Sequence, residues 1–191
     1  QATATARRLG AVVQVYDVRP AVKGEVESLG ARFVELPLDT EGAEAKGGYA
    51  SDMDEEFYRR QRELMATVVA ESDVVITTAA VPGKRAPVLV SAEMVKGMTP
   101  GSVIVDLAAE GGGNCELTAP GETVTQHGVT IIGATNVPST VPYHASSMFA
   151  RNAVNLLLHM VRDGEMHLDM EDEIVAETVL TRDGEVVHPR V

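Results

Sequence analysis

The sequence contains a single cysteine, Cys115, among its 191 residues. One cysteine can form neither a disulfide within the chain nor a metal site built from several thiolates, and this usage fits a reducing compartment. The five histidines lack the H-x-x-x-H spacing of paired metal ligands, and no serine stands in a G-x-S-x-G context. We therefore predict neither a metal site nor a serine hydrolase.

Positive charge is also scarce. The sequence has 16 Lys and Arg residues against 28 Asp and Glu residues, which gives a formal net charge of −12. An acidic surface repels nucleic acid and anionic lipid, so we predict no nucleic-acid partner. No apolar run approaches the roughly 20 residues of a membrane-spanning helix, although the chain could belong to a larger membrane assembly. A hydrophobic content of 45% is sufficient for a buried core.

The amino-terminal end lacks an initiator methionine, an apolar secretory segment and a clear helix start. Its first residues instead resemble the middle of a helix that Gly10 closes. We expect the chain to be truncated at this end.

Short apolar segments alternate with helical patterns along most of the chain. The predicted strands are 11–16, 31–36, 73–78, 102–106 and 129–133, and the predicted helices are 20–29, 54–71, 92–96 and 145–161. This alternation predicts an α/β fold, a Rossmann-like doubly wound parallel sheet covered on both faces, without its first strand and glycine loop. We assign 1–143 to this partial nucleotide-binding domain. We assign 144–191 to a long helix and a C-terminal tail that returns to a missing N-terminal subdomain. Within this tail, 173–187 is predicted to form a β-hairpin that turns at Asp183-Gly184.

Asp17 ends the first predicted strand, where an acid can accept hydrogen bonds from the ribose hydroxyls of a dinucleotide. In the dinucleotide fingerprint this acid lies about 20 residues after the glycine turn, which would fall at or before residue 1 here. Capping of the next helix explains Asp17 equally well. An acid at this place favours NAD over NADP, because it would repel a 2′-phosphate, but the nearby Arg19 weakens that argument.

Two further strand ends have compositions that suit a cofactor. The small residues 77–83 allow a flat ring to approach the backbone, or they form a tight turn. Asp106, Glu110 and the glycines 111–113 could shape a nicotinamide pocket, although strand-end carboxylates are more often solvated or capping. The polar, glycine-containing segment 37–52 predicts a long loop with a possible function. We assign no catalytic residue.

Seven strings are more specific than these patterns: ATARRLGA (4–11), YDVRPAVK (16–23), GGYA (47–50), ITTA (76–79), PGSVIVDLAAE (100–110), GGNCEL (112–117) and TRDGEVVHP (181–189). Together they closely resemble the NAD(H)-binding domain of the proton-translocating nicotinamide nucleotide transhydrogenases, which is the soluble alpha-subunit component. The alanine dehydrogenases share the fold and a looser version of several strings.

The resemblance implies roles for individual residues. Segment 37–52 matches a mobile loop that closes over bound nucleotide, with Tyr49 covering the cofactor. The residues that hold the adenosine ribose match 17–19, and further nucleotide contacts match the helix and strand end that follow. The implied cofactor-binding residues are Asp17, Val18, Arg19, Gly48, Tyr49, Gln61, Thr78 and Ala80.

The implied reaction is hydride transfer from NADH on this domain to NADP⁺ on a separate domain, coupled to proton movement through a membrane domain. Because the cofactors carry this chemistry, no acid or base on the protein is required. The implied partners are the NADP(H)-binding domain, the membrane domain and a second copy of this component, at the cytoplasmic face of a bacterial inner membrane. The alternatives are an amino-acid dehydrogenase of the alanine type and a fragment that folds without binding nucleotide.

We predict that these 191 residues alone bind NADH weakly or not at all, because the glycine turn and helix N-terminus that receive the pyrophosphate are missing from the sequence. Isothermal titration calorimetry tests this prediction. Micromolar affinity of the isolated chain for NADH would contradict it.

Overall fold

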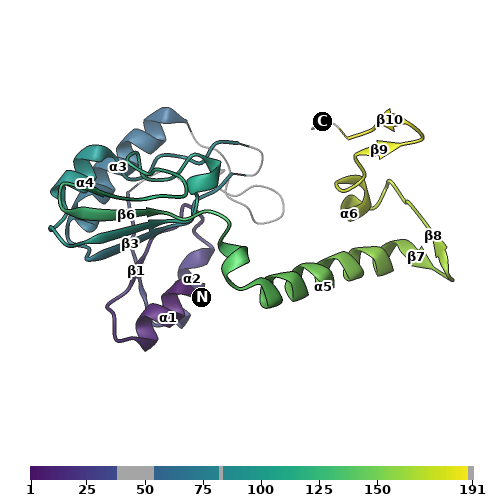
Figure 1. Ribbon diagram of the computed structural model, residues 1–191, viewed down its shortest axis with the longest axis horizontal. Helices are drawn as coiled ribbons and strands as arrows, with labels where there is room; N and C mark the ends of the chain where they lie inside the picture. The colour runs from purple at the N-terminus through teal and green to yellow at the C-terminus, as the bar shows by residue number, and fades with distance from the viewer. Residues whose placement is uncertain (38–53, 82–83, 189–191) are drawn as a thin grey trace. The chain divides into compact units, whose positions relative to one another are not determined.

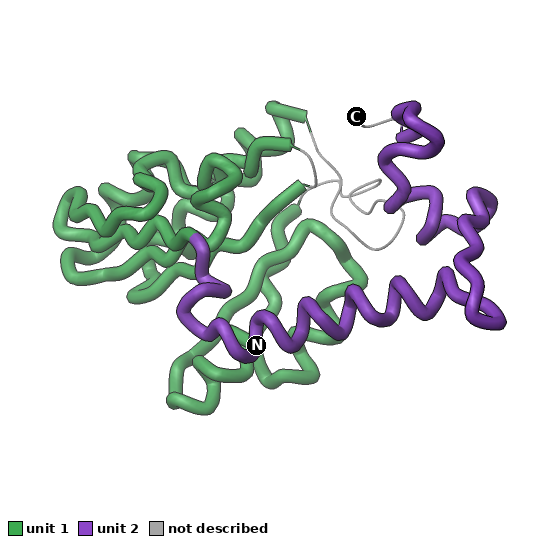
Figure 2. The backbone as a smooth tube through the Cα atoms, turned by 45° about the vertical axis from the view of Figure 1, so that its right-hand side comes forward, with its two compact units in different colours: residues 1–135 green, residues 136–191 purple. Residues whose placement is uncertain are grey.

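The computed structural model describes residues 1–37, 54–81 and 84–188, and it divides into two units, 1–135 and 136–191 (Figure 2). The first unit contains the parallel strands, and the second contains a long helix followed by short hairpins. Among the residues described, no helix combines the length and the apolar character that crossing a bilayer demands.

A four-stranded sheet with the order β3-β4-β6-β5 forms the centre of the first unit (Figure 1). Strands β3 (Val74–Thr77), β4 (Val103–Asp106) and β6 (Val129–Gly133) are parallel. Strand β5 (Thr123–Gln126) pairs antiparallel with β6 at the edge, so the sheet is not parallel throughout as predicted. The apolar pattern did not predict β5.

Strands β1 (Gln14–Val15) and β2 (Arg32–Phe33) pair parallel in a separate two-stranded sheet. They are shorter than the predicted strands, and Val12 is 92% exposed although the pattern predicted a buried strand. Helices α1 (Ala2–Arg8) and α2 (Val22–Ser28) flank β1. As the sequence predicts, Gly10 and Gly30 follow these two helices in the left-handed conformation that glycine adopts most readily.

The core lies between one face of the four-stranded sheet and helices α3 (Glu55–Ala70) and α4 (Ala92–Gly97). Its buried side chains are Val69, Val90, Met94, Val95, Met98, Ile104, Cys115, Val129 and Ile131. On the other face Val74 and Ile76 are exposed, so within the described residues of the first unit the predicted cover is observed for one face.

Helix α5 (Pro142–Met160) opens the main part of the second unit, after the 3-10 turn η2 (Val137–Thr140). It begins three residues earlier than the predicted 145, because Pro142 occupies the first turn, where its missing N–H costs nothing. None of its residues is buried, and Met148 is 70% exposed.

The tail after α5 contains two hairpins with a helical turn between them. Strands β7 (Val161–Arg162) and β8 (Glu165–Met166) form the first hairpin, and β9 (Thr181–Arg182) and β10 (Glu185–Val186) form the second. The predicted turn at Asp183-Gly184 is confirmed. The predicted hairpin range 173–187 is too long, because Asp172 caps the short helix α6 (Glu173–Ala176) within it.

Three hairpins of the described chain use the same two-residue turn. His127-Gly128, Asp163-Gly164 and Asp183-Gly184 all have positive φ at both residues, 53° at the first and 81–86° at the second. This conformation is that of the type I′ turn, whose twist matches that of the paired strands.

We predict that Gly133→Ala destabilises the protein by roughly 1–3 kcal/mol, because an added Cβ would collide with the carbonyl oxygen of Ala119. Gly24→Ala is the matched control, since Gly24 lies exposed on α2 with no atom near an added Cβ. The control is expected to stabilise the helix by roughly 0.5–1 kcal/mol. Urea unfolding measures both changes, and equal midpoints for the two variants would contradict the prediction.

Candidate functional site

Asp17 lies two residues beyond the carboxyl end of β1 and is held by Arg19. Its Oδ1 accepts hydrogen bonds from the backbone N (2.9 Å) and the Nε (3.0 Å) of Arg19, and its Oδ2 accepts from Nη2 (2.9 Å). A carboxylate has about four lone-pair positions, so with respect to the described residues one position on Oδ2 remains for a further donor. The side chains of Arg19 and Asp17 are partly exposed, at 29% and 24% respectively. The guanidinium of Arg19 therefore pairs with the Asp17 carboxylate and does not extend into solvent.

A cavity of about 240 Å³ opens beside Asp17. It is smaller than the roughly 300–1,000 Å³ of ordinary ligand pockets, so it suits one part of a large ligand. An ion pair between Lys23 and Glu35 lies at this cavity, and the hydrogen bond from Lys23 to Glu35 raises the pKa of the ammonium group. The lining residues are Tyr16, Asp17, Val18, Pro20, Lys23, Phe33, Val34, Glu35 and Leu36.

Gln61 reaches the same region from α3, although it is 45 residues from Tyr16 in the sequence. Its side chain is 2% exposed, and its Nε2 donates to the hydroxyl of Tyr16 (2.8 Å). Within the described parts of the chain, nothing donates to its Oε1. A buried acceptor left unpaired costs roughly 1–3 kcal/mol, and a donor from outside the described residues, such as a water, a ligand or another part of the chain, would remove this cost.

Thr78 and Ala80 follow β3 at the carboxyl end of the strand, where a cofactor-contacting segment is expected. Ala79 between them is held by the side chain of Asn114, whose Oδ1 accepts from the backbone N of Ala79 (2.9 Å). Asn114 was not among the predicted site residues. Its signal was weak, because an asparagine after three glycines also suits an ordinary turn.

Asp106 does not form the wall of a pocket, as the sequence suggested it could. Its carboxylate is fully buried and accepts hydrogen bonds from five donors. The reason is that the chain turns back after β4 and brings backbone N–H groups over the strand end. The donors are Thr77 Oγ1, Thr118 Oγ1 and the backbone N of Ala108, Asn114 and Cys115. Glu110, on the 3-10 turn η1 (Ala109–Gly111), is exposed.

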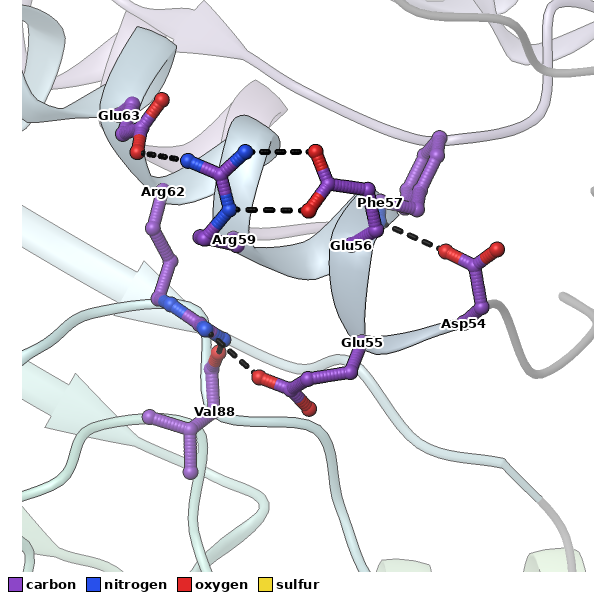
Figure 3. A network of polar contacts seen from close by, with 8 residues as sticks. All are labelled: Asp54, Glu55, Glu56, Phe57, Arg59, Arg62, Glu63 and Val88. Carbon is purple, nitrogen blue, oxygen red and sulfur yellow. Dashed lines mark hydrogen bonds and ion pairs between the residues drawn. The ribbon is translucent and has the colours of Figure 1, made fainter.

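A larger cavity of about 680 Å³ between α3 and α4 contains none of the predicted site residues. Its arginines already have partners (Figure 3). Arg59 pairs with Glu56 and Glu63, and the hydrogen bonds to Glu56 raise the pKa of its guanidinium further. Arg62 donates to the carbonyl of Val88 (3.0 Å) and to Glu55 (2.9 Å). We therefore place the candidate site at Asp17 and Gln61.

The structure brings Asp17, Val18 and Gln61 close together through Tyr16, and it places Thr78 and Ala80 at the end of β3. Gly48 and Tyr49 lie outside the described residues, and their predicted roles stay predictions.

Residues 1–189 match the family model described as "Alanine dehydrogenase/PNT, C-terminal domain". The chain belongs to this family. The resemblance to the transhydrogenases is confirmed by two curated relatives. The first part of the NAD(P) transhydrogenase subunit alpha of Rhodospirillum rubrum is 52% identical over 99% of this chain and 50% of its own length. The NAD(P) transhydrogenase subunit alpha of Haemophilus influenzae is 48% identical over 98% of this chain and 37% of its own length.

Solved structures of similar proteins confirm the Rossmann-like fold class. The transhydrogenase of Sinorhizobium meliloti superposes with a TM-score of 0.78 at 45% identity, over 98% of this chain and 49% of that one. An L-alanine dehydrogenase superposes with a TM-score of 0.69 at 28% identity, over 97% and 46%. The chain thus spans about half the length of the relatives it matches.

We predict that Gln61→Leu raises the pKa of the Tyr16 phenol further. Burial already raises this pKa, and the hydrogen bond from Gln61, which lowers it, would be lost. Ultraviolet absorbance of the phenolate during an alkaline titration measures the change, with Tyr16→Phe as the control that assigns the signal. A Tyr16 midpoint that is unchanged or lower in Gln61→Leu would contradict the arrangement.

Proposed function

We propose that this chain forms the NAD(H)-binding part of a proton-translocating NAD(P) transhydrogenase. The observation that carries the proposal is the juxtaposition at the end of β1: a carboxylate with one remaining acceptor position, a cavity beside it, and the buried Oε1 of Gln61 without a donor among the described residues. Ribose hydroxyls and the adenine amino group are donors that such acceptors bind. The family match supports nicotinamide nucleotide as the ligand class.

Asp17 would hold the adenosine ribose, and Val18 and the apolar part of the cavity would contact the adenine. Phe33, Val34 and Leu36 supply apolar surface there. Arg19 would act on Asp17 rather than on the nucleotide, because three hydrogen bonds join it to that carboxylate. This arrangement supports NAD(H) over NADP(H). The 2′-phosphate of NADP(H) would lie near the negative carboxylate of Asp17, while the guanidinium of Arg19 is already paired with that carboxylate and would not neutralise the phosphate.

Thr78 and Ala80 would contact the nucleotide at the end of β3, where their small side chains permit close approach to the backbone. When bound, NADH supplies the hydride. The residues of this chain then bind and orient it, and they need no proton-transfer group. The exposed Glu110 and the fully buried Asp106 agree with this, because neither stands in a half-buried position suited to general acid–base catalysis.

The whole protein would pass the hydride to NADP⁺ on a separate NADP(H)-binding domain and act with a membrane domain. We place it at the cytoplasmic face of a bacterial inner membrane, with this component as a homodimer. The relatives are named as subunits of bacterial NAD(P) transhydrogenases, which supports the presence of partner subunits; the homodimer and the cytoplasmic face follow from the resemblance alone.

An alanine-type dehydrogenase is the second candidate, since the L-alanine dehydrogenase fold superposes over nearly the whole chain. The alanine dehydrogenase of Bacillus subtilis is 33% identical over only 66% of this chain, against 52% over 99% for the Rhodospirillum rubrum protein. The difference favours the transhydrogenase.

Two assays of the full-length protein separate the candidates. The transhydrogenase predicts hydride transfer from NADH to an NADP⁺ analogue once an NADP(H)-binding component is added. Oxidation of NADH that depends on pyruvate and ammonium, without such transfer, would instead establish the alanine dehydrogenase.

We predict that Asp17→Asn weakens NADH binding by the full-length protein by roughly 1–3 kcal/mol, through loss of a charge-assisted hydrogen bond to the ribose. Asp73→Asn is the control, because Asp73 is an exposed acid at the amino end of β3, away from the strand end that binds ligands. Calorimetry compares the two dissociation constants. An unchanged dissociation constant for Asp17→Asn would leave Asp17 with a structural role alone.

A further inference from the structure

Asn114 is fully buried, and its side-chain amide makes three hydrogen bonds to the backbone of two other segments. Its Oδ1 accepts from the backbone N of Ala79 (2.9 Å), and its Nδ2 donates to the carbonyl of Ala79 (2.9 Å). The same Nδ2 donates to the carbonyl of Pro87 (2.8 Å). One amide thus satisfies both backbone groups of Ala79, as a neighbouring β-strand would.

Ala79 is the residue between Thr78 and Ala80, the two predicted nucleotide contacts at the end of β3. Because both its N–H and its C=O are bonded, the peptides on either side of it cannot rotate without breaking a hydrogen bond to a buried side chain. Such a break leaves the amide of Asn114 unpaired inside the protein, which is unfavourable. The backbone that presents Thr78 and Ala80 is therefore fixed by a side chain from a different loop.

Asp106 in turn fixes Asn114. Its Oδ2 accepts from the backbone N of Asn114 (2.8 Å), and the neighbouring Cys115 N also donates to it (3.0 Å). The chain can return to Asp106 within eight residues because Gly112 and Gly113 have φ values of 107° and 81°. A Cβ on Gly113 would lie only 2.9 Å from Asp106 Oδ2, so a side chain there would disturb the carboxylate.

The segment that returns from β3 toward α4 is fixed from the same loop. The carbonyl of Asn114 accepts from the backbone N of Leu89 (2.8 Å) and Val90 (3.0 Å). Arg62 on α3 holds the carbonyl of the preceding residue, Val88 (3.0 Å). Asn114 therefore anchors the chain both at Ala79 and at the segment that leads into α4.

We propose that Asn114 is a positioning residue for the nicotinamide nucleotide, holding the backbone after β3 in its binding geometry before the nucleotide arrives. Asp106 keeps Asn114 in place. The inference rests on the proposed function and adds to it a residue that itself need not touch the ligand. Its physical advantage is that a binding segment ordered in advance loses less conformational entropy when the ligand binds.

Two substitutions in the full-length protein test the proposal by NADH titration. Asn114→Asp keeps the shape but turns an oxygen toward the carbonyls of Ala79 and Pro87, and Asn114→Ser is too short to reach them. Both are expected to raise the dissociation constant about ten- to hundredfold, the size expected when a preorganised contact is lost.

Ile131→Val is the control for general destabilisation, because Ile131 is fully buried on β6, in the core between the sheet and its helices. Thermal unfolding of each variant shows how far stability has fallen. A positioning role predicts weaker NADH binding in the Asn114 variants at temperatures where they are folded, and unchanged binding in Ile131→Val. Loss of affinity in proportion to stability in all three variants would overturn the proposal.

Amide hydrogen exchange in the unsubstituted protein tests the same inference without a variant. The Ala79 amide is expected to exchange slowly before NADH is added, at a rate comparable with that of Ile104 in β4. Rapid exchange at Ala79 would overturn the inference, even if NADH binds. If the unsubstituted full-length protein binds no NADH, the proposed function fails and this inference fails with it. If the full-length protein binds NADH and its Asn114 variants bind equally well, only the inference fails.

Discussion

The burial of one carboxylate organises the carboxyl end of the four-stranded sheet. Within the described residues Asp106 has no cationic partner, and five N–H and O–H donors stabilise it instead. A buried carboxyl group is tolerated only when donors of this kind surround it. The return of the chain after β4, the two left-handed glycines and the position of Asn114 all follow from that requirement.

The predicted nucleotide site depends on a different use of charge. Asp17 is only partly buried, and its cationic partner Arg19 lies two residues away in the sequence. A local pair of this kind forms without help from the rest of the fold. The position of Asp17 after a predicted strand indicated this residue from the sequence pattern, whereas Val18 and Arg19 came from the resemblance. Gln61 is different, because its burial against Tyr16 requires α3 to pack beside β1.

Much of the fold was readable because its elements are specified locally. Apolar runs such as 102–106 and 129–133 predicted β4 and β6, and glycines at positive φ marked the ends of α1 and α2. Strand β5 was missed because His127-Gly128 is an unusual type I′ pair, whereas Asp163-Gly164 carried the ordinary signal and was overlooked. Residues of the site came largely from the resemblance. Asn114 escaped prediction because its partners, Ala79, Pro87 and Asp106, are brought together only by the tertiary fold.

The position of β3 at the edge of its sheet has a practical consequence. Its residues, Val-Val-Ile-Thr, carry no charge, proline or bulge, and Val74 and Ile76 are 58% and 45% exposed. Edge strands of natural proteins usually carry such features, because unpaired backbone groups beside apolar side chains recruit strands from other molecules. In the part of the chain that the structure describes, no strand pairs with the outer side of β3. At high concentration, these 191 residues alone will therefore tend to aggregate through β3. The net charge of −12 makes the molecules repel one another but does not block pairing at this uncharged strand.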